Sequence, residues 1–339
     1  MAAQNKMAIQ NLLPVRPRLI ADELVKVNDF FNSQLDCSDD RLAPFMDYLK
    51  ERQGKMLRAS FVLLAGKLFS PAAELHIKIA GIVEMIHAAT LLHDDVIDNA
   101  AHRRHLATAN NLWGSNLAVL MGDYLLSRTF VAVASLQRDD INRLLTETAV
   151  KVCRGEMLQN ACRGDFSIGI EEYLDIIEKK TAIFFANCCK LGAMASNADE
   201  QSAERLYKFG LNFGMSFQII DDLVDILIAE SQTGKTAGTD RLTGTLTLPV
   251  IHAFGVLDSK AKSELLDAFD NEQADINHII SILHKSKSID YAKSRAQEYL
   301  AKTISILDYF GCHPAAQELK NLVFSVTNQT EPLKHEGAK

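Results

Sequence analysis

Two acidic motifs of identical spacing constrain this chain more than any other feature. The first, LLHDDVID, holds Asp94, Asp95 and Asp98, and the second, FQIIDDLVD, holds Asp221, Asp222 and Asp225. Both read D-D-x-x-D in apolar surroundings with helical periodicity, and residues four apart lie on one face of an α-helix. Each motif therefore places its first and last carboxylates on one stripe of a helix, with the middle carboxylate beside them.

Carboxylates in apolar segments need a compensating cation, because a buried charge without a partner costs free energy. Clustered carboxylates are hard oxygen ligands, and Mg²⁺ typically binds a few protein oxygens together with substrate phosphate. A single motif of this kind is usually only a solvated charged face of a helix. Here apolar residues at 90–92 and 217–220 leave little room for such a face. The repeated motif predicts two metal-binding patches that face each other across a cavity and hold a diphosphate.

Composition narrows the class of protein further. The chain has 339 residues with a net charge of −7, which disfavours a nucleic-acid partner. No apolar run reaches about 18 residues without a charge, so we expect no transmembrane segment. The six cysteines form no C-x-x-C pair and are typical of small core residues in a reducing cytosol, so we expect a cytoplasmic protein.

Helical periodicity extends through most of the chain, and no convincing alternating strand segment is found. We therefore expect one all-α domain over residues 1–339, with an N-terminal arm at 1–16 and a flexible tail at 328–339. About a dozen helices are expected, for example Leu19 to Leu35, Met56 to Phe69, Ala72 to Ile97, Leu117 to Leu136, Ile141 to Gln159, Ile170 to Ala195 and Ala203 to Ile228. Breaks are expected at Gly54, at 102–111, at 163–165 and at 231–244, and the last is placed to cover the site as a loop.

A metal site for diphosphate should be matched by cations, and lysines and arginines recur beside the breaks and the acidic motifs. They are Lys55, Arg58, Arg103, Arg104, Lys180 and Lys235. Arginine suits bidentate phosphate binding, and a glycine before a helix start suits phosphate approach to free backbone N–H groups. His87 lies two helical turns before Asp94, and Gln218 lies three residues before Asp221, so both share the carboxylate faces. Each of these residues alone could equally be an ordinary surface or core side chain.

In order, these segments resemble the all-trans isoprenyl diphosphate synthases, or polyprenyl synthetases, and most of all their bacterial medium- and long-chain members. The matching segments are GKMLR, MIHAATLLHDDVID, RR, GSNLAVLMGDYLLSR, GEMLQ, KKTA, FQIIDDLVD, GKTAGTD and TLTLPV. They span about Gly54 to Pro249. The resemblance implies antiparallel helices around a large central cavity, with both acidic motifs at its mouth and with two chains in a homodimer.

The resemblance also implies a reaction, in which isopentenyl diphosphate condenses with an allylic diphosphate. Three Mg²⁺ ions would bind the allylic diphosphate through Asp94, Asp98 and Asp221. The same diphosphate would contact Arg103, Lys180 and Lys235, and isopentenyl diphosphate would contact Lys55, Arg58, His87 and Arg104. The catalytic set would also include Asp95 and Asp222, and the substrate-binding set would include Thr181 and Gln218. A long polyprenyl tail must eventually partition into a membrane, so transient membrane contact is a possible route for product release.

Product length in this family depends on the residues four and five positions before the first aspartate. These are Thr90 and Ala89 here, and neither is aromatic, so the floor of the cavity is open at that level. The resemblance therefore favours a product of about six to ten isoprene units. Met85, Met157 or Phe184 could close the cavity deeper down, and a C20 product is the alternative.

Two departures from the family pattern bear on activity. His105 replaces a glycine after the paired arginines, which can shift their loop, and Thr245 replaces a lysine before the Thr-Leu-Pro segment. Loss of one charged donor at a transition state typically costs about 2–4 kcal/mol, although Arg241 could substitute for it. These departures leave open a weakly active regulatory subunit of a heteromeric synthase. A terpene cyclase is a further alternative, because such enzymes also use a D-D-x-x-D motif. The second D-D-x-x-D motif disfavours the cyclase.

Overall fold

The computed structural model describes residues 17–52, 54–103, 106–227, 239–270 and 276–327. The expected arm at 1–16 and tail at 328–339 lie outside these ranges, as do Gln53, Arg104, His105 and Lys235. The prediction of one domain over the whole chain stays a prediction.

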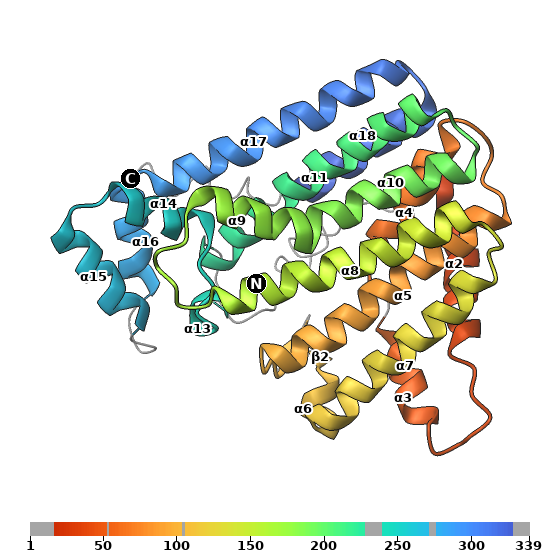
Figure 1. Ribbon diagram of the computed structural model, residues 1–339, viewed down its shortest axis with the longest axis horizontal. Helices are drawn as coiled ribbons and strands as arrows, with labels where there is room; N and C mark the ends of the chain where they lie inside the picture. Colours follow the sequence, from red (N-terminus) through yellow and green to blue (C-terminus); the bar gives the residue numbers. More distant parts are fainter. Residues whose placement is uncertain (1–16, 53, 104–105, 228–238, 271–275, 328–339) are drawn as a thin grey trace, which may run out of the picture.

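The described residues form an all-α bundle, which confirms the predicted fold class (Figure 1). The first half contains η1 (Arg18–Ile20), α2 (Ala21–Gln34), α3 (Ala43–Glu51), α4 (Leu57–Lys67), α5 (Glu74–Ile97), β1 (His102–Arg103), β2 (Leu106–Ala107), α6 (Ala109–Trp113), α7 (Ser115–Ala134) and α8 (Asp139–Ala161). The second half contains α9 (Ile170–Ile177), η2 (Glu178–Ala182), α10 (Ile183–Ala195), α11 (Glu200–Leu227), α13 (Thr239–Leu242), α14 (Leu248–Val256), α15 (Ser259–Asp270), α16 (Ile276–Lys285), α17 (Ser288–Leu307), η3 (Asp308–Phe310) and α18 (Pro314–Thr327).

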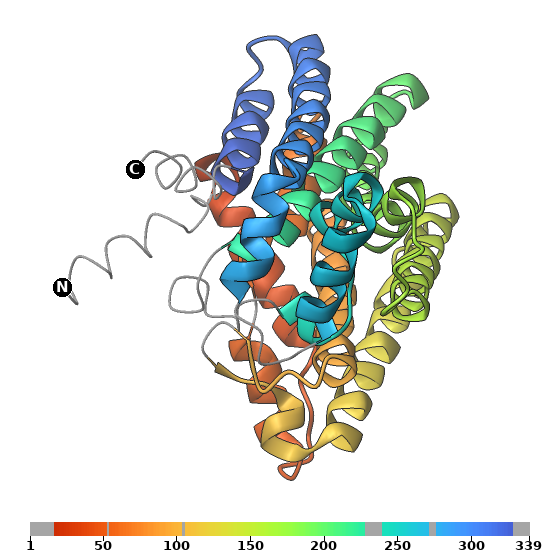
Figure 2. The ribbon, with the colours of Figure 1, turned by 90° about the vertical axis from the view of Figure 1, so that its left-hand side faces the viewer.

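Helix α11 is the axis of the bundle, because it packs along both α10 and α17. Helices α4 and α8 cover other sides of α10, and α5 packs between α4 and α7. Figure 1 shows these long helices side by side, and the view turned by 90° in Figure 2 places the short strand pair at the lower end of the bundle. The apolar periodicity of each long helix gives it a face to bury against its neighbours.

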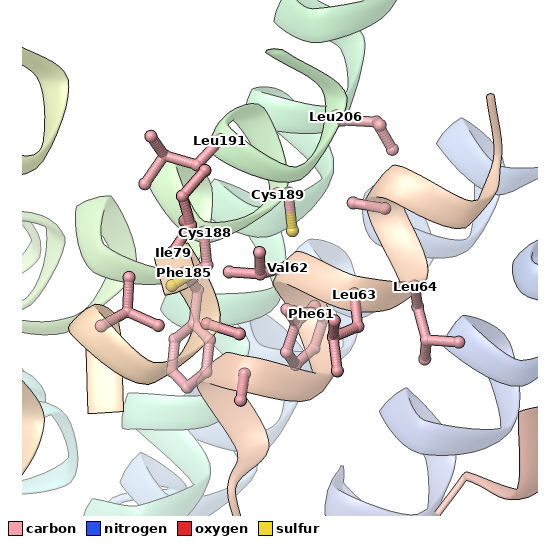
Figure 3. Close-up of a cluster of buried hydrophobic side chains, with 14 of the residues drawn as sticks. Phe61, Val62, Leu63, Leu64, Ile79, Phe185, Cys188, Cys189, Leu191 and Leu206 are labelled. Atoms are coloured by element: carbon pink, nitrogen blue, oxygen red, sulfur yellow. The ribbon is translucent and has the colours of Figure 1, made fainter. Parts of the chain in front are cut away.

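One hydrophobic core is formed by α4, α5, α10 and the first half of α11. Figure 3 shows part of it, with Phe61 and Val62 from α4 lying against Phe185 and Cys188 from α10. The Phe61 and Phe185 rings meet edge to face with their centroids 5.4 Å apart. The two helix backbones approach closely at Gly192, where an added Cβ would lie 2.2 Å from the Val62 carbonyl oxygen.

A second core is formed by α9, α14, α16, α17 and the last part of α11. Helix α11 therefore changes cores along its length: Phe213 belongs to the first core and Met215 to the second. The intervening Gly214 faces Ala182 at the end of η2, and a Cβ on Gly214 would lie 2.4 Å from the Cα atom of Ala182. Only a residue without a side chain allows the two backbones to come this close.

Two sequence expectations about local structure are wrong. Residues 170–195 were expected to form one continuous α-helix, but a single π-helical turn, η2, separates α9 from α10. Secondly, a strand pair exists where no strand was expected, with His102 opposite Ala107 and Arg103 opposite Leu106. Each strand has only two residues, which is too short to show an alternating pattern.

Two described helices, α5 and α7, are long and apolar enough to cross a bilayer by length and composition. In α5, 67% of the apolar window is buried inside the protein, so its composition is accounted for by the core. The corresponding buried share of α7 is 39%. The prediction of no transmembrane segment counted only charge-free runs, and it stays a prediction.

The buried His76 links the fold to pH. Its Nε2 atom lies 2.9 Å from the Ser196 hydroxyl, and its Nδ1 accepts the Ala73 N–H. Burial lowers the pKa of His76, because the charged imidazolium loses its hydration. The unfolded chain therefore binds more protons than the folded protein between the depressed folded pKa and the unfolded pKa of about 6.5. The stability that His76 contributes is complete above the unfolded pKa and is lost as the pH falls through the folded pKa.

We expect the free energy of unfolding to fall more steeply from about pH 7 to about pH 5 in the wild type than in His76→Gln. The difference between the two slopes should amount to on the order of 1 kcal/mol over this range. Urea denaturation at each pH measures it, and His284→Gln, at an exposed histidine, is the matched control. Parallel curves for the wild type and His76→Gln would contradict the prediction.

Candidate active site

Lys180 is presented to the interior by the π-helical turn η2. This turn packs against α8 at Gly155, where a Cβ would lie 2.3 Å from the backbone nitrogen of Lys180. The Lys180 Nζ atom then reaches Oε2 of Glu156, the next residue of α8, at 2.8 Å. Burial alone would lower the pKa of Lys180, but Glu156 and Asp94 outweigh it and raise that pKa, so the ammonium stays charged.

The first acidic motif lies at the C-terminal end of α5, and its three carboxylates have different surroundings. No hydrogen bond from the described residues reaches the Asp94 carboxylate. Burial, reinforced by Glu156, raises the pKa of Asp94 to about 7, whereas Lys180 and Arg103 oppose that shift. Asp98 is instead paired with Arg163, whose Nη2 donates to Oδ1 at 2.5 Å.

Asp95, the middle carboxylate of the first motif, is paired with Arg103. Its side chain is buried, and its Oδ1 accepts a hydrogen bond from Nε of Arg103 at 2.7 Å. The Asn110 side chain donates to the Asp95 backbone carbonyl at 3.1 Å. Burial raises the pKa of Asp95, and the guanidinium of Arg103 acts against that rise. Asp95 therefore orients Arg103 at the strand pair that follows α5.

The second acidic motif is held by a chain of hydrogen bonds. The buried Tyr173 hydroxyl donates to Oδ2 of Asp222 at 2.6 Å, and the Gln218 amide donates to Oδ1 at 2.8 Å. The Thr181 hydroxyl in turn donates to the Gln218 carbonyl oxygen at 2.7 Å. Burial raises the pKa of Asp222 to about 6, and the hydrogen bonds from Tyr173 and Gln218 limit that rise. Both oxygens of Asp222 thus accept hydrogen bonds from protein donors.

Lys180 connects the two motifs. Its positive charge acts on Asp94 from the first motif and on Asp222 from the second, and it lowers the pKa of each. A chain of hydrogen bonds gives the geometric link to the second motif, because Thr181, the residue after Lys180, donates to Gln218, and Gln218 donates to Asp222. The turn η2 therefore lies beside the second motif and carries a charge that acts on the first.

A second group of cations lies beside the first motif. The Arg58 guanidinium lies over the Phe184 and Phe185 rings, 4.8 and 4.9 Å from their centroids. Burial lowers the pKa of Arg58, while Glu84 and Asp94 raise it, which places Arg58 within electrostatic reach of the first motif. Lys55 is exposed just before α4, and His87 is half-buried on α5.

The segment after the second motif contains Arg241 and Thr245. The Thr245 hydroxyl lies 3.0 Å from the Thr243 hydroxyl, and a small pocket there is also lined by Asp225, Asp240 and Arg241. Arg241 thus lies next to the position where the family carries a lysine. The predicted loop cation, Lys235, lies outside the described residues, as does Arg104.

The carboxylates fit a divalent cation that is shared with a substrate. In the described part of the chain, no three His, Cys, Asp or Glu side chains form a metal cluster by themselves. Asp94 nevertheless offers a carboxylate without a hydrogen-bond donor, and burial leaves it in need of a cation. Mg²⁺ usually keeps only one or two protein carboxylates and takes further oxygens from phosphate, so the observed donors suit it.

Three residues of this site escaped the sequence reasoning. Glu156 lies in the segment GEMLQ, which was noted only as part of the family pattern. Tyr173 lies in an ordinary amphipathic helix, and its partner is 49 residues away. Arg163 was regarded only as part of a break between helices, and its partner is 65 residues away. Contacts at such separations leave no periodic signal in the sequence.

Comparison with known proteins defines the class. A sequence profile of the polyprenyl synthetase family matches residues 39–285. The heptaprenyl diphosphate synthase component 2 of Geobacillus stearothermophilus is 34% identical over 308 residues, which cover 91% of this chain and 96% of the relative. The chain belongs to the polyprenyl synthetase family and is a prenyltransferase, as the motifs predict.

Solved structures agree with this assignment. A decaprenyl diphosphate synthase from Rhodobacter capsulatus superposes with a TM-score of 0.85 at 29% identity, over 92% of this chain and 97% of that one. A polyprenyl synthase from Caulobacter crescentus, solved with calcium and isoprenyl diphosphate, also gives a TM-score of 0.85 at 29% identity, over 94% and 97% of the two chains. A protein of this fold has therefore been solved with a divalent metal and an isoprenyl diphosphate together.

The close approach of Gly155 to η2 can be tested directly. In Gly155→Ala the new methyl group would overlap the Lys180 backbone, which cannot move aside as a side chain could. We expect a loss of about 1–3 kcal/mol in stability and a fall of about 10- to 100-fold in turnover, because Lys180 is displaced. Gly255→Ala is the matched control, since a Cβ there meets nothing within 4 Å. Equal behaviour of the two variants would refute this role of Gly155.

Proposed function

We propose that this protein condenses isopentenyl diphosphate with an allylic diphosphate of the geranyl or farnesyl type, giving a medium- or long-chain all-trans polyprenyl diphosphate. The observation that carries the proposal is the geometry around η2: Lys180 pairs with Glu156 at 2.8 Å, and its neighbour Thr181 donates at 2.7 Å to Gln218, which holds Asp222. The charge of Lys180 also acts on Asp94 of the first motif. A cation near both acidic motifs can bind a substrate diphosphate that lies between them. An ion pair with only a structural role would need carboxylates from one motif alone.

The allylic diphosphate binds between the two motifs in this proposal. Three Mg²⁺ ions held by Asp94, Asp98 and Asp221 would neutralise the diphosphate and stabilise the charge that develops on it. Lys180 and Arg103 bind the same group, and Asp95 keeps Arg103 in place. Together these charges favour the transition state in which the C–O bond ionises, because they face the oxygen that becomes negative.

Isopentenyl diphosphate binds beside it, against Lys55, Arg58 and His87, with Arg104 as a further candidate. The stacking of Arg58 on two phenylalanine rings restrains its side chain before the substrate arrives. The double bond of isopentenyl diphosphate attacks the allylic carbocation, and the released diphosphate takes the proton that is then lost. Apolar walls keep water from the cation.

The product extends along α5 past Thr90 and Ala89 in this proposal. Ala89 is buried, and the Thr90 hydroxyl donates to the His87 carbonyl, so neither presents a large side chain to the path. Met85 and Phe184 are both buried and remain candidates for the floor. The expectation that Met157 might close the cavity is wrong, because its side chain is 67% exposed on α8.

The assay that tests the function combines purified protein, Mg²⁺, farnesyl diphosphate and radiolabelled isopentenyl diphosphate, and measures product length. We expect a discrete product of about six to ten isoprene units, and a shorter product from Ala89→Phe because its ring would block the path. Met157→Phe, on the exposed face of α8, is the control and should leave product length unchanged. A C20 product from the wild type would move the floor toward Ala89, and no incorporation would overturn the proposal.

A homodimer is our proposal for the assembly, and α7 and α8 supply its support. Large apolar side chains are exposed on both helices, among them Leu120 at 61%, Phe130 at 60% and Val150 at 68%. Exposed apolar groups on neighbouring helices favour an interface with another protein. The alternative is a heteromer in which this chain is one subunit, which Thr245 motivates and which the name of the relative, component 2, also suggests.

Light scattering after gel filtration distinguishes these assemblies. We expect a dimer from the isolated wild type, and Leu120→Asp with Phe130→Asp should shift it toward the monomer because each places a charge in the interface. Val25→Asp, at an exposed valine on α2, is the matched control. A monomer that gains activity only with a second synthase subunit would favour the heteromer. The cytoplasmic location and a transient membrane contact for product release stay predictions.

A further inference from the structure

Arg163 lies in the short connection between α8 and α9, which is anchored at both ends. Cys162 caps α8, and the Gly164 N–H donates to the Gly244 carbonyl at 2.9 Å. Gly164 has a φ of +71°, which a residue without a side chain adopts most easily. The connection is therefore attached to the segment that follows the second acidic motif, while its arginine points to the first.

The guanidinium of Arg163 makes only part of the contacts that it could make. One nitrogen, Nη2, donates to Asp98 at 2.5 Å. The Nε atom is buried and has no hydrogen-bond partner among the described residues. The side chains of Arg163 and Asp98 are 23% and 30% exposed, so a ligand can reach this pair from the site. A guanidinium carries five N–H donors, and among the described residues Arg163 makes only the bond to Asp98.

We propose that Arg163 is a further binding residue for the diphosphate of the allylic substrate. The proposal rests on the function proposed above, in which Asp98 binds a cation when substrate is present. That cation neutralises Asp98, so the pairing with Arg163 weakens while the backbone anchors keep the arginine close. The freed donors then face the oxygens of the metal-bound diphosphate, which arginine binds in a bidentate manner.

The same pair has a simpler explanation, in which Arg163 only fastens the α8–α9 connection to α5. If Arg163 only links this connection to α5, its substitution would lower stability and leave the affinity for diphosphate unchanged. In a third case, Arg163 would compete with the metal for Asp98, and its removal would tighten binding. The three cases predict different directions for diphosphate affinity, so a binding measurement separates them.

The experiment compares the wild type with Arg163→Gln and Arg163→Lys. Isothermal titration calorimetry measures the binding of inorganic diphosphate in the presence of Mg²⁺, and thermal unfolding measures stability. Steady-state kinetics then separates the KM for farnesyl diphosphate from kcat and from the KM for isopentenyl diphosphate. The matched control is Arg138→Gln, because Arg138 pairs with Asp140 at the opposite end of α8.

We expect Arg163→Gln to weaken binding of inorganic diphosphate by about 10- to 100-fold, which is typical of a lost charged hydrogen bond. The KM for farnesyl diphosphate should rise by a similar factor and the KM for isopentenyl diphosphate should not. Arg163→Lys should recover part of the affinity, and Arg138→Gln should match the wild type.

Unchanged or tighter binding by Arg163→Gln would overturn the inference, whatever its effect on stability. The proposed function is judged separately. If the wild type binds diphosphate but incorporates no isopentenyl diphosphate, the function fails, and the role of Arg163 is still decided by the binding data.

Discussion

The arrangement of this protein depends on a buried ammonium group between carboxylates. Lys180 pairs with Glu156 and acts electrostatically on both acidic motifs. Without a cation there, the carboxylates would repel one another in an apolar interior and would have to take up protons. In the proposed function, the same charge that allows the acidic helices to pack together also binds the diphosphate, so folding and substrate binding would depend on one interaction.

Much of this could be predicted from the sequence, because the relevant patterns are local. Apolar periodicity located the long helices, and the spacing of Asp94 and Asp98 placed both carboxylates on one helical face. The π-helical turn at 178–182 could not be predicted, since it contains no proline or glycine and is set by contact with Gly155 on another helix. The partners of Tyr173 and Arg163 were likewise out of reach, because both pairs join distant parts of the chain.

Met157 shows a different limit of sequence reasoning. Its helix carries apolar residues on more than one side, so periodicity identifies the helix but not the side that faces inward. The structure places Met157 outward, exposed on α8. Met157 therefore does not line the interior, and in the proposed dimer it is available to contact a second chain. Tyr173 shows the opposite situation. It lies in an amphipathic helix without a distinctive sequence motif, yet its hydroxyl donates a hydrogen bond to Asp222 of the second motif.

The contact between Gly214 and Ala182 has a consequence for how disturbances spread. Both the α9–α10 segment and α11 leave one hydrophobic core and enter the other at this crossing. Lys180 and Gln218 lie within a few residues of it, so two of the proposed substrate-binding groups lie beside a seam between these two cores. Weaker packing in either core would change how α11 and the α9–α10 segment lie against each other at this crossing. Substitutions deep in either core, far from any substrate, are therefore able to alter catalysis without touching a catalytic side chain.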